Sequence, residues 1–221
     1  MEVGELHLQR ALASLSRSFL FFSLPPDWVA VAREAALAAE AFHAAGLLRR
    51  EAKALRLCAQ AERNLGKPKA AGKAMQKLGD LLIKEKKAAR RSSNHTNDGI
   101  SKTNAGGAAA AAYEEAMQCY GEAICLFRAA GAVEVAVELL LKVAARREHE
   151  KTPSAFALCA EAYEEALHLL IIRHDLQQAD EVYRHYICSL VRAKELQKAL
   201  SVVFRRVECL YTLRRFCLSF V

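Results

Sequence analysis

The sequence is poor in the residues that build sheets and in those that interrupt helices. Only 7% of its 221 residues are aromatic, and there are 4 prolines and 10 glycines, whereas apolar residues make up 53%. Sheets are enriched in aromatic and β-branched residues, while alanine, which supplies much of the apolar total here, is the strongest helix former. Few stretches alternate between apolar and polar residues. The composition therefore predicts an all-α protein.

The sequence also lacks the usual signatures of catalysis and of metal binding. It contains no GxGxxG, GxxxxGK, GxSxG or HExxH motif. The seven cysteines are scattered and form no CxxC pair, which is typical of reduced cysteines acting as small hydrophobes. His168 and Cys159 could be neighbours in space, but nothing in the sequence orients them as a catalytic pair. We therefore expect neither enzymatic activity nor a metal or other cofactor.

No apolar run approaches the roughly 20 residues that a membrane-spanning helix needs. Glu2 and Glu5 stand where a secretory signal peptide carries positive charge, and Arg17 interrupts the apolar stretch that follows. The sequence therefore predicts a cytoplasmic protein, and any membrane contact it makes should be peripheral.

Apolar periodicity and turn signals predict a series of helices with a break about every 20 residues. The break at Phe42–Gly46 is closely repeated at Phe127–Gly131, and Gly66 and Pro68 mark another. This period is typical of stacked, tetratricopeptide-like helical hairpins, so we expect a solenoid of eight or nine helices. The predicted helices span 4–17, 28–45, 51–65, 68–87, 109–130, 133–149, 154–173, 176–192 and 195–213.

Residues 88–107 have no periodicity and few large apolar side chains. They are predicted to form a flexible inserted loop without a function of their own. This loop would separate N-terminal hairpins at 1–87 from a continuing helical array at 108–215.

Positive charge is concentrated in one segment. Between Arg49 and Arg91 there are fourteen Lys or Arg residues against four Asp or Glu, although the whole chain carries only +7. Lys69, Lys73 and Lys77 form a column on one face of the predicted helix 68–87. The column is either an ordinary solvated face or a surface for an acidic partner. The segment contains no Phe, Tyr or Trp, so we expect no specific nucleic-acid partner.

The stretch Ser18–Leu24 is strongly apolar and precedes Pro25 and Pro26, which no helix interior would accept. Two interpretations remain open from the residues alone. The stretch either touches an apolar surface such as a membrane, or it packs as a hydrophobic staple on the helix at 28–45, with Trp28 as its partner. Its apolar residues are Phe19, Leu20, Phe21, Phe22 and Leu24.

Three segments in this order resemble the soluble NSF-attachment proteins (SNAPs), most closely the gamma type. They are the apolar loop Ser18–Leu24, the alanine-rich stretch Ala35–Ala52, and the segment Tyr120–Gly131. The resemblance covers about residues 10 to 213. The family extends further at its C-terminal end, in the part that stimulates the ATPase, so the resemblance is to a C-terminally shortened member.

The resemblance implies an adaptor in vesicular transport and membrane fusion, including ER–Golgi transport. Such an adaptor binds the four-helix SNARE bundle and recruits the hexameric ATPase NSF, while its apolar loop touches the membrane. The membrane-contact residues would be Phe19, Leu20, Phe21, Phe22 and Leu24. Charge pattern alone nominates the SNARE-binding candidates Arg49, Lys53, Arg56, Lys69, Lys73 and Lys77. The alternative is a generic tetratricopeptide-like scaffold or co-chaperone that binds peptide partners in its groove.

Overall fold

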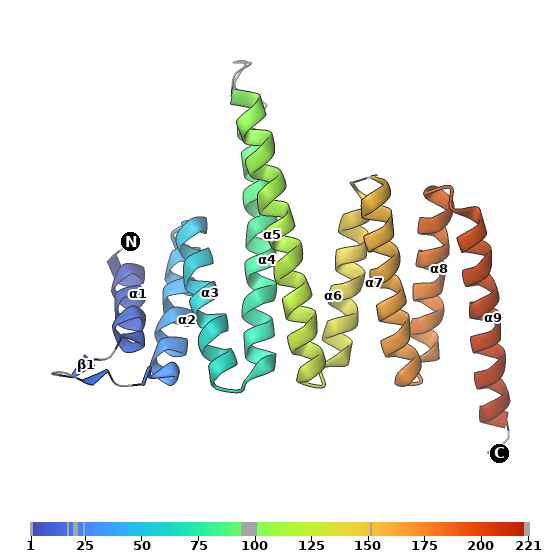
Figure 1. The fold of residues 1–221 in the computed structure, drawn as a ribbon, viewed down its shortest axis with the longest axis horizontal. Helices are drawn as coiled ribbons and strands as arrows, with labels where there is room; N and C mark the ends of the chain where they lie inside the picture. Colours follow the sequence, from blue (N-terminus) through green and yellow to red (C-terminus); the bar gives the residue numbers. More distant parts are fainter. Residues whose placement is uncertain are drawn as a thin grey trace. The chain divides into compact units, whose positions relative to one another are not determined.

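The computed structural model describes residues 2–16, 18–19, 22–23, 25–93, 101–150 and 152–218. The described residues form nine helices and one pair of two-residue strands, which divide into two compact units, Met1–Ala132 and Val133–Val221. The all-α fold predicted from the sequence is confirmed, and within each unit successive helices pack as hairpins (Figure 1).

In the first unit each helix packs against the next along the chain. Its helices are α1 (Glu2–Leu15), α2 (Trp28–Ala44), α3 (Leu48–Asn64), α4 (Pro68–Ser93) and α5 (Ser101–Ala129). The second unit follows the same rule with α6 (Val133–Glu148), α7 (Pro153–Ile172), α8 (Leu176–Arg192) and α9 (Leu196–Leu218).

Five of the connections between helices share one backbone conformation. In each, the second turn residue has a positive φ, and the next residue's N–H donates to a carbonyl five residues back, as in a Schellman motif. In the first unit glycine fills this position, which L-residues with a Cβ adopt only at a cost. In the second unit His174 and Lys194 take it, with φ of 59° and 63°. The positive-φ glycines are Gly46, Gly66 and Gly131.

Aromatic rings from one helix press directly onto glycines of its neighbour in the first unit. A Cβ added to Gly79 of α4 would lie 2.7 Å from the ring of Tyr120 on α5, and one added to Gly4 of α1 would lie 2.8 Å from Phe42. Both rings are fully buried. Tyr120 also donates a 2.6 Å hydrogen bond to Asp80, which fixes the register of α4 and α5.

The apolar stripe expected on the helix at 68–87 faces the core. All six of its members are buried: Ala71, Ala74, Met75, Leu78, Leu81 and Leu82. Because this stripe packs inward, the lysine column on the opposite side of α4 is left exposed, as the sequence pattern requires.

The flexible loop predicted for 88–107 is wrong over most of its length. Residues 88–93 continue α4, and residues 101–107 belong to α5, while 94–100 lie outside the described residues. The two helices pack along each other and extend past α2 and α3 in Figure 1, so α5 completes the first unit. The boundary between the two compact units falls after Ala132.

The stretch between α1 and α2 contains a short antiparallel pair of strands, β1 (Ser18–Phe19) and β2 (Phe22–Ser23), in which Phe19 pairs with Phe22. Leu20, Phe21 and Leu24 lie outside the described residues. The stretch ends where the Asp27 N–H donates to the carbonyl of Ser14, and the Asp27 side chain then caps α2.

Trp28, the expected partner of the apolar stretch, is half-buried at the start of α2. It packs on a small core of Val31, Ala32 and Ala61, together with Leu15, Leu57 and Leu65. These neighbours come from α1, α2, α3 and the turn after α3, so Trp28 has core contacts within the helices themselves.

Candidate functional site

A groove of about 530 Å³ runs along the first unit between α2 and α4, with α3 beneath it. The apolar surface that α2 and α4 contribute to the groove consists mainly of alanines, and their small side chains leave the space between the helices unfilled. Leu55 and Cys58 of α3 form part of the floor. The alanines that line it are Ala36, Ala39, Ala44, Ala70 and Ala74.

One wall of the groove is basic. Lys73, Lys77 and Lys84 of α4 line it, are exposed, and take part in no ion pair within the described part of the chain. Their spacing of four and seven residues places them on one side of the helix. We call these three residues the lysine wall.

The structure places the sequence-predicted lysines in two positions. Lys73 and Lys77 belong to the lysine wall, whereas Lys69 is exposed beyond the end of the groove, beside a hollow at the start of α4. Lys84 was missed by the sequence reasoning. Its spacing of seven residues from Lys77 was the signal that could have found it.

The basic candidates of α3 are not brought into the groove. Arg49 lies 3.4 Å from Glu85 of α4, and Arg56 pairs with Glu115 of α5, so both bridge helices within the unit. Lys53 is exposed outside the groove lining. Charge counting alone could not separate these bridging cations from the lysine wall.

The floor of the groove also holds a buried carboxylate. Glu51, in the first turn of α3, is only 8% exposed, and its Oε1 lies 2.9 Å from Nδ1 of His43 on α2. Its Oε2 is buried and has no hydrogen-bond partner among the described residues. Both side chains line the groove, together with Glu40 of α2 and Asp80 of α4. An unsatisfied buried carboxylate oxygen costs stability, and sequence reasoning did not identify it.

Cys58 of α3 and Lys77 of α4 both line the groove. Burial is the largest cause acting on the Cys58 thiol and raises its pKa; Glu62 raises the pKa further, and Lys77 opposes both. A raised pKa makes this thiol a weak nucleophile, so Cys58 is part of the groove surface and is not suited to catalysis.

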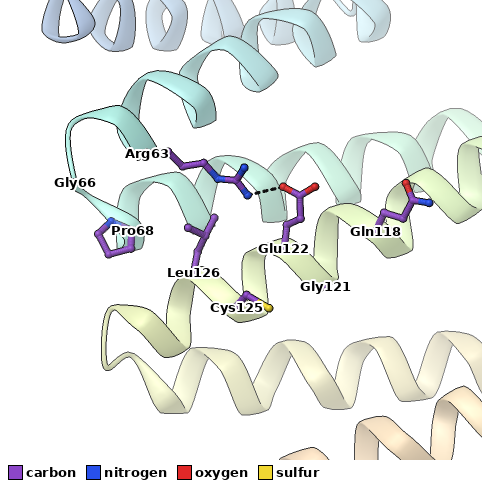
Figure 2. Close-up of a pocket in the computed structure, with 8 residues that line it drawn as sticks. All are labelled: Arg63, Gly66, Pro68, Gln118, Gly121, Glu122, Cys125 and Leu126. Carbon is purple, nitrogen blue, oxygen red and sulfur yellow. Dashed lines mark hydrogen bonds and ion pairs between the residues drawn. The ribbon is translucent and has the colours of Figure 1, made fainter.

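A second and shallower hollow lies where α3 ends and α4 begins, against α5 (Figure 2). Its volume is about 710 Å³, and most of its lining is apolar. Arg63 reaches across it to Glu122 at 2.5 Å, and Gly121 and Cys125 of α5 are exposed along its edge. A Cβ added to Gly121 would meet no atom within 4 Å. The ion pair links α3 to α5, so these two lining residues have a structural role in the first unit.

The described part of the chain also shows where the other candidate residues lie. Three or more His, Cys, Asp or Glu side chains nowhere gather there as metal ligands would. Cys159 is buried and contacts Ser189, and burial raises its pKa to about 11, while His168 is exposed. The structure therefore does not pair them as a catalytic dyad.

Among the described residues, no helix has both the length and the apolar character needed to cross a membrane.

No protein-family model matches this chain, and no curated protein matches it significantly.

Proposed function

We propose that the protein is an adaptor of the SNAP type, which binds an assembled SNARE four-helix bundle along the lysine wall and recruits an NSF-type hexameric ATPase to it. The observation that carries this proposal is the lysine wall itself. Three exposed cations stand on one side of α4, and none is neutralised by a described neighbour. The sequence resemblance to the SNAP family supplies the identity of the partner.

The physical basis is electrostatic. Surface cations that face solvent attract an acidic helical partner over a distance of about 8 Å at physiological salt and speed its encounter. Each exposed pair contributes little on its own, typically 0.2–1 kcal/mol, so several in a row are needed. A row along one helix suits another helix lying beside it.

The membrane is proposed as a second anchor. Residues Phe19, Leu20, Phe21, Phe22 and Leu24 would insert into the lipid interface near the SNARE bundle. A single weak apolar anchor gives only marginal membrane binding, but combined with protein contact it increases overall affinity by avidity.

Charge reversal tests the partner directly. The variant Lys73→Glu/Lys77→Glu should weaken binding to a purified SNARE bundle by about 10-fold or more, because it replaces two attractions by two repulsions. Lys194→Glu/Lys198→Glu changes the net charge equally in the second unit and should leave the affinity nearly unchanged. Equal losses in both variants would mean that only net charge matters, and absence of wild-type binding would contradict the proposal.

Liposome co-sedimentation tests the membrane contact. The variant Phe21→Ser/Phe22→Ser should stay folded by circular dichroism and lose binding to the vesicles. If the variant unfolds, the rings belong to the core, and the staple interpretation of the stretch is correct. If the wild type does not sediment with vesicles, the membrane part of the proposal fails.

A peptide-binding scaffold is the second candidate, and the alanine-lined groove favours it. A scaffold of this kind should bind a single extended or helical peptide at least as well as an assembled bundle. The SNAP-type adaptor should prefer the bundle. Competition between the two ligands for the same protein separates these functions.

A further inference from the structure

Helix α9 of the second unit is apolar on two sides. It packs on α8 through one side, where Ala199 and Val202 are buried. The helical repeat of about 3.6 residues per turn places five large apolar side chains on the side away from these two. A solvent-facing side of a helix is normally polar, and a contiguous exposed apolar patch marks a surface for another molecule. We call the five residues the α9 stripe, and each is more than half exposed: Leu196, Leu200, Phe204, Val207 and Tyr211.

Positive charge is held away from the α9 stripe. Arg205 lies 3.2 Å from Glu164 of α7, and Arg206 lies 2.7 Å from Asp180 of α8. Both guanidinium groups are therefore directed towards neighbouring helices of the same unit. The stripe itself contains no charged residue. Two such stripes can meet without the repulsion that like charges would cause.

The spacing of the α9 stripe is nearly the same in both directions along the helix. Counted from Phe204, Leu200 and Val207 lie four and three residues away, and the outermost pair lies eight and seven residues away. In a two-fold pair of antiparallel helices, a residue before the centre of one copy lies against the residue equally far after the centre of the other. Phe204 would then meet its own copy, with Leu200 against Val207 on each side. Leu196 would meet Tyr211 at the two ends.

The spacing also suits close packing of two helices. The steps of four, three and four residues from Leu200 to Tyr211 are those of a coiled-coil seam, in which side chains of one helix enter gaps between those of the other. One edge of the stripe carries Gln197 near its start and Glu208 near its end. An antiparallel pair brings these ends together, so the Gln197 amide of one copy can donate to the Glu208 carboxylate of the other.

We propose that the protein forms a two-fold dimer in which the α9 stripes of two copies pack antiparallel. Five side chains that each lose roughly 100 Å² of exposed area give about 1,000 Å² for the pair, which is at the lower limit of specific interfaces. The dimer is therefore weak and reversible, with a dissociation constant of about 10–100 µM. This inference concerns a surface of the second unit and does not use the proposed SNARE partner.

A charge placed at the two-fold axis tests the dimer. Analytical ultracentrifugation of the wild-type chain at about 5 and 200 µM should show a shift from monomer towards dimer. Phe204→Glu should stay monomeric, because the new carboxylate would meet its own copy. Ile172→Glu makes the same kind of exchange at a site that is 61% exposed on α7, and it should keep the dimer. A wild type that is monomeric at the higher concentration would overturn the proposal, as would a dimer that both variants keep or both lose while folded by circular dichroism.

Cysteine cross-linking tests the antiparallel geometry without a new charge. Under mild oxidation Phe204→Cys should form a disulfide between two copies, which peptide mass spectrometry distinguishes from links at the native cysteines. Leu196→Cys should not link to its own copy, because the two positions would be about 22 Å apart, but it should link to Tyr211→Cys when the two variants are mixed. Self-linkage of Leu196→Cys would indicate a parallel pair and contradict the proposal. Linkage at Phe204→Cys no greater than at Ile172→Cys would also contradict it.

Discussion

The two units use the same hairpin architecture but deal with their charges differently. In the first unit the lysine wall faces solvent beside a groove. In the second unit the described arginines of α8 and α9 are engaged by acidic neighbours: Arg184 and Arg206 contact Asp180, Arg192 contacts Glu148, and Arg205 contacts Glu164. Arg192, Arg205 and Arg206 join neighbouring helices and are therefore less available to a partner, which favours the first unit as the proposed binding surface.

The units also differ in their apolar surfaces. The first buries Phe42, Tyr120 and Phe127 completely against neighbouring helices. The second stacks Tyr163 on Tyr186, with ring centroids 5.4 Å apart, but leaves an apolar stripe exposed along α9. The stripe consists of Leu196, Leu200, Phe204, Val207 and Tyr211, each more than half exposed. Phenylalanines such as Phe42 and Phe127 therefore stabilise the core of the first unit, whereas Phe204 of the second unit lies mostly exposed.

The largest expected effect compares two phenylalanines. Phe127→Ala should lower the free energy of unfolding of the first unit by about 3–5 kcal/mol, because the ring is fully buried. Phe204→Ala removes a ring that is 60% exposed and should cost less than about 1 kcal/mol. Urea unfolding followed by Trp28 fluorescence reports the first unit, since Trp28 is the only tryptophan, and circular dichroism reports both. Similar losses would show that the units do not differ in this way.

A smaller effect on stability is expected where an aromatic ring packs against a glycine. Gly79→Ala forces a Cβ to within 2.7 Å of the Tyr120 ring and should cost about 1–3 kcal/mol by overpacking. The matched control is Gly121→Ala on α5, where the added Cβ meets nothing, and it should stabilise by about 0.5–1 kcal/mol through helix propensity. Opposite signs of the two shifts in urea midpoint are the diagnostic result. A stabilising Gly79→Ala would contradict the described packing of α4 on α5.

The turns provide a comparison between the units. Gly46→Ala should destabilise the first unit by about 1 kcal/mol, because it places a Cβ at a φ of 69°. Lys194→Gly makes the reverse change in the second unit and removes the strain of a Cβ at positive φ. Because glycine costs more entropy to order, the net stabilisation should be only several tenths of a kcal/mol. Thermal unfolding followed by circular dichroism measures both. Destabilisation by Lys194→Gly would mean that the lysine side chain contributes more than the strain it causes.

The smallest effect is a pH dependence within each unit. The hydrogen bond from His7 lowers the pKa of Glu34 in the first unit, and that from Arg206 lowers the pKa of Asp180 in the second. A carboxyl whose pKa is depressed on folding contributes stability above its unfolded pKa and loses it as pH falls through the folded value. Glu34→Gln and Asp180→Asn should therefore destabilise at pH 7 and much less at pH 3. An equal shift in urea midpoint at both pH values would assign the losses to packing.

Local signals were enough to predict most helices. Gly46, Gly66 and Gly131 each follow a helix and fix a turn, and the predicted helix at 176–192 is observed as Leu176–Arg192. His174 and Lys194 gave weaker signals because nothing in their chemistry requires a positive φ. The failure at 88–107 has a different cause, since α4 and α5 are continued there by packing on each other. Contact between two helices cannot be seen in the periodicity of either one.

The candidate site was only half predictable. The spacing of Lys69, Lys73 and Lys77 placed a charged column on one helix, and all three are exposed. That Arg49 and Arg56 are engaged by Glu85 and Glu115 depends on which helices become neighbours. The buried Glu51 likewise becomes notable only once α2 and α4 enclose it, because its sequence context is that of an ordinary helical glutamate.

Lysine acetylation footprinting with and without a saturating SNARE bundle shows which lysines a bound partner covers. We expect Lys73, Lys77 and Lys84 to become several-fold slower to acetylate when the bundle is bound, while Lys194 and Lys198 keep their rates. Protection confined to Lys194 and Lys198, or equal rates at all five lysines with the bundle bound, would contradict a binding surface on the first unit.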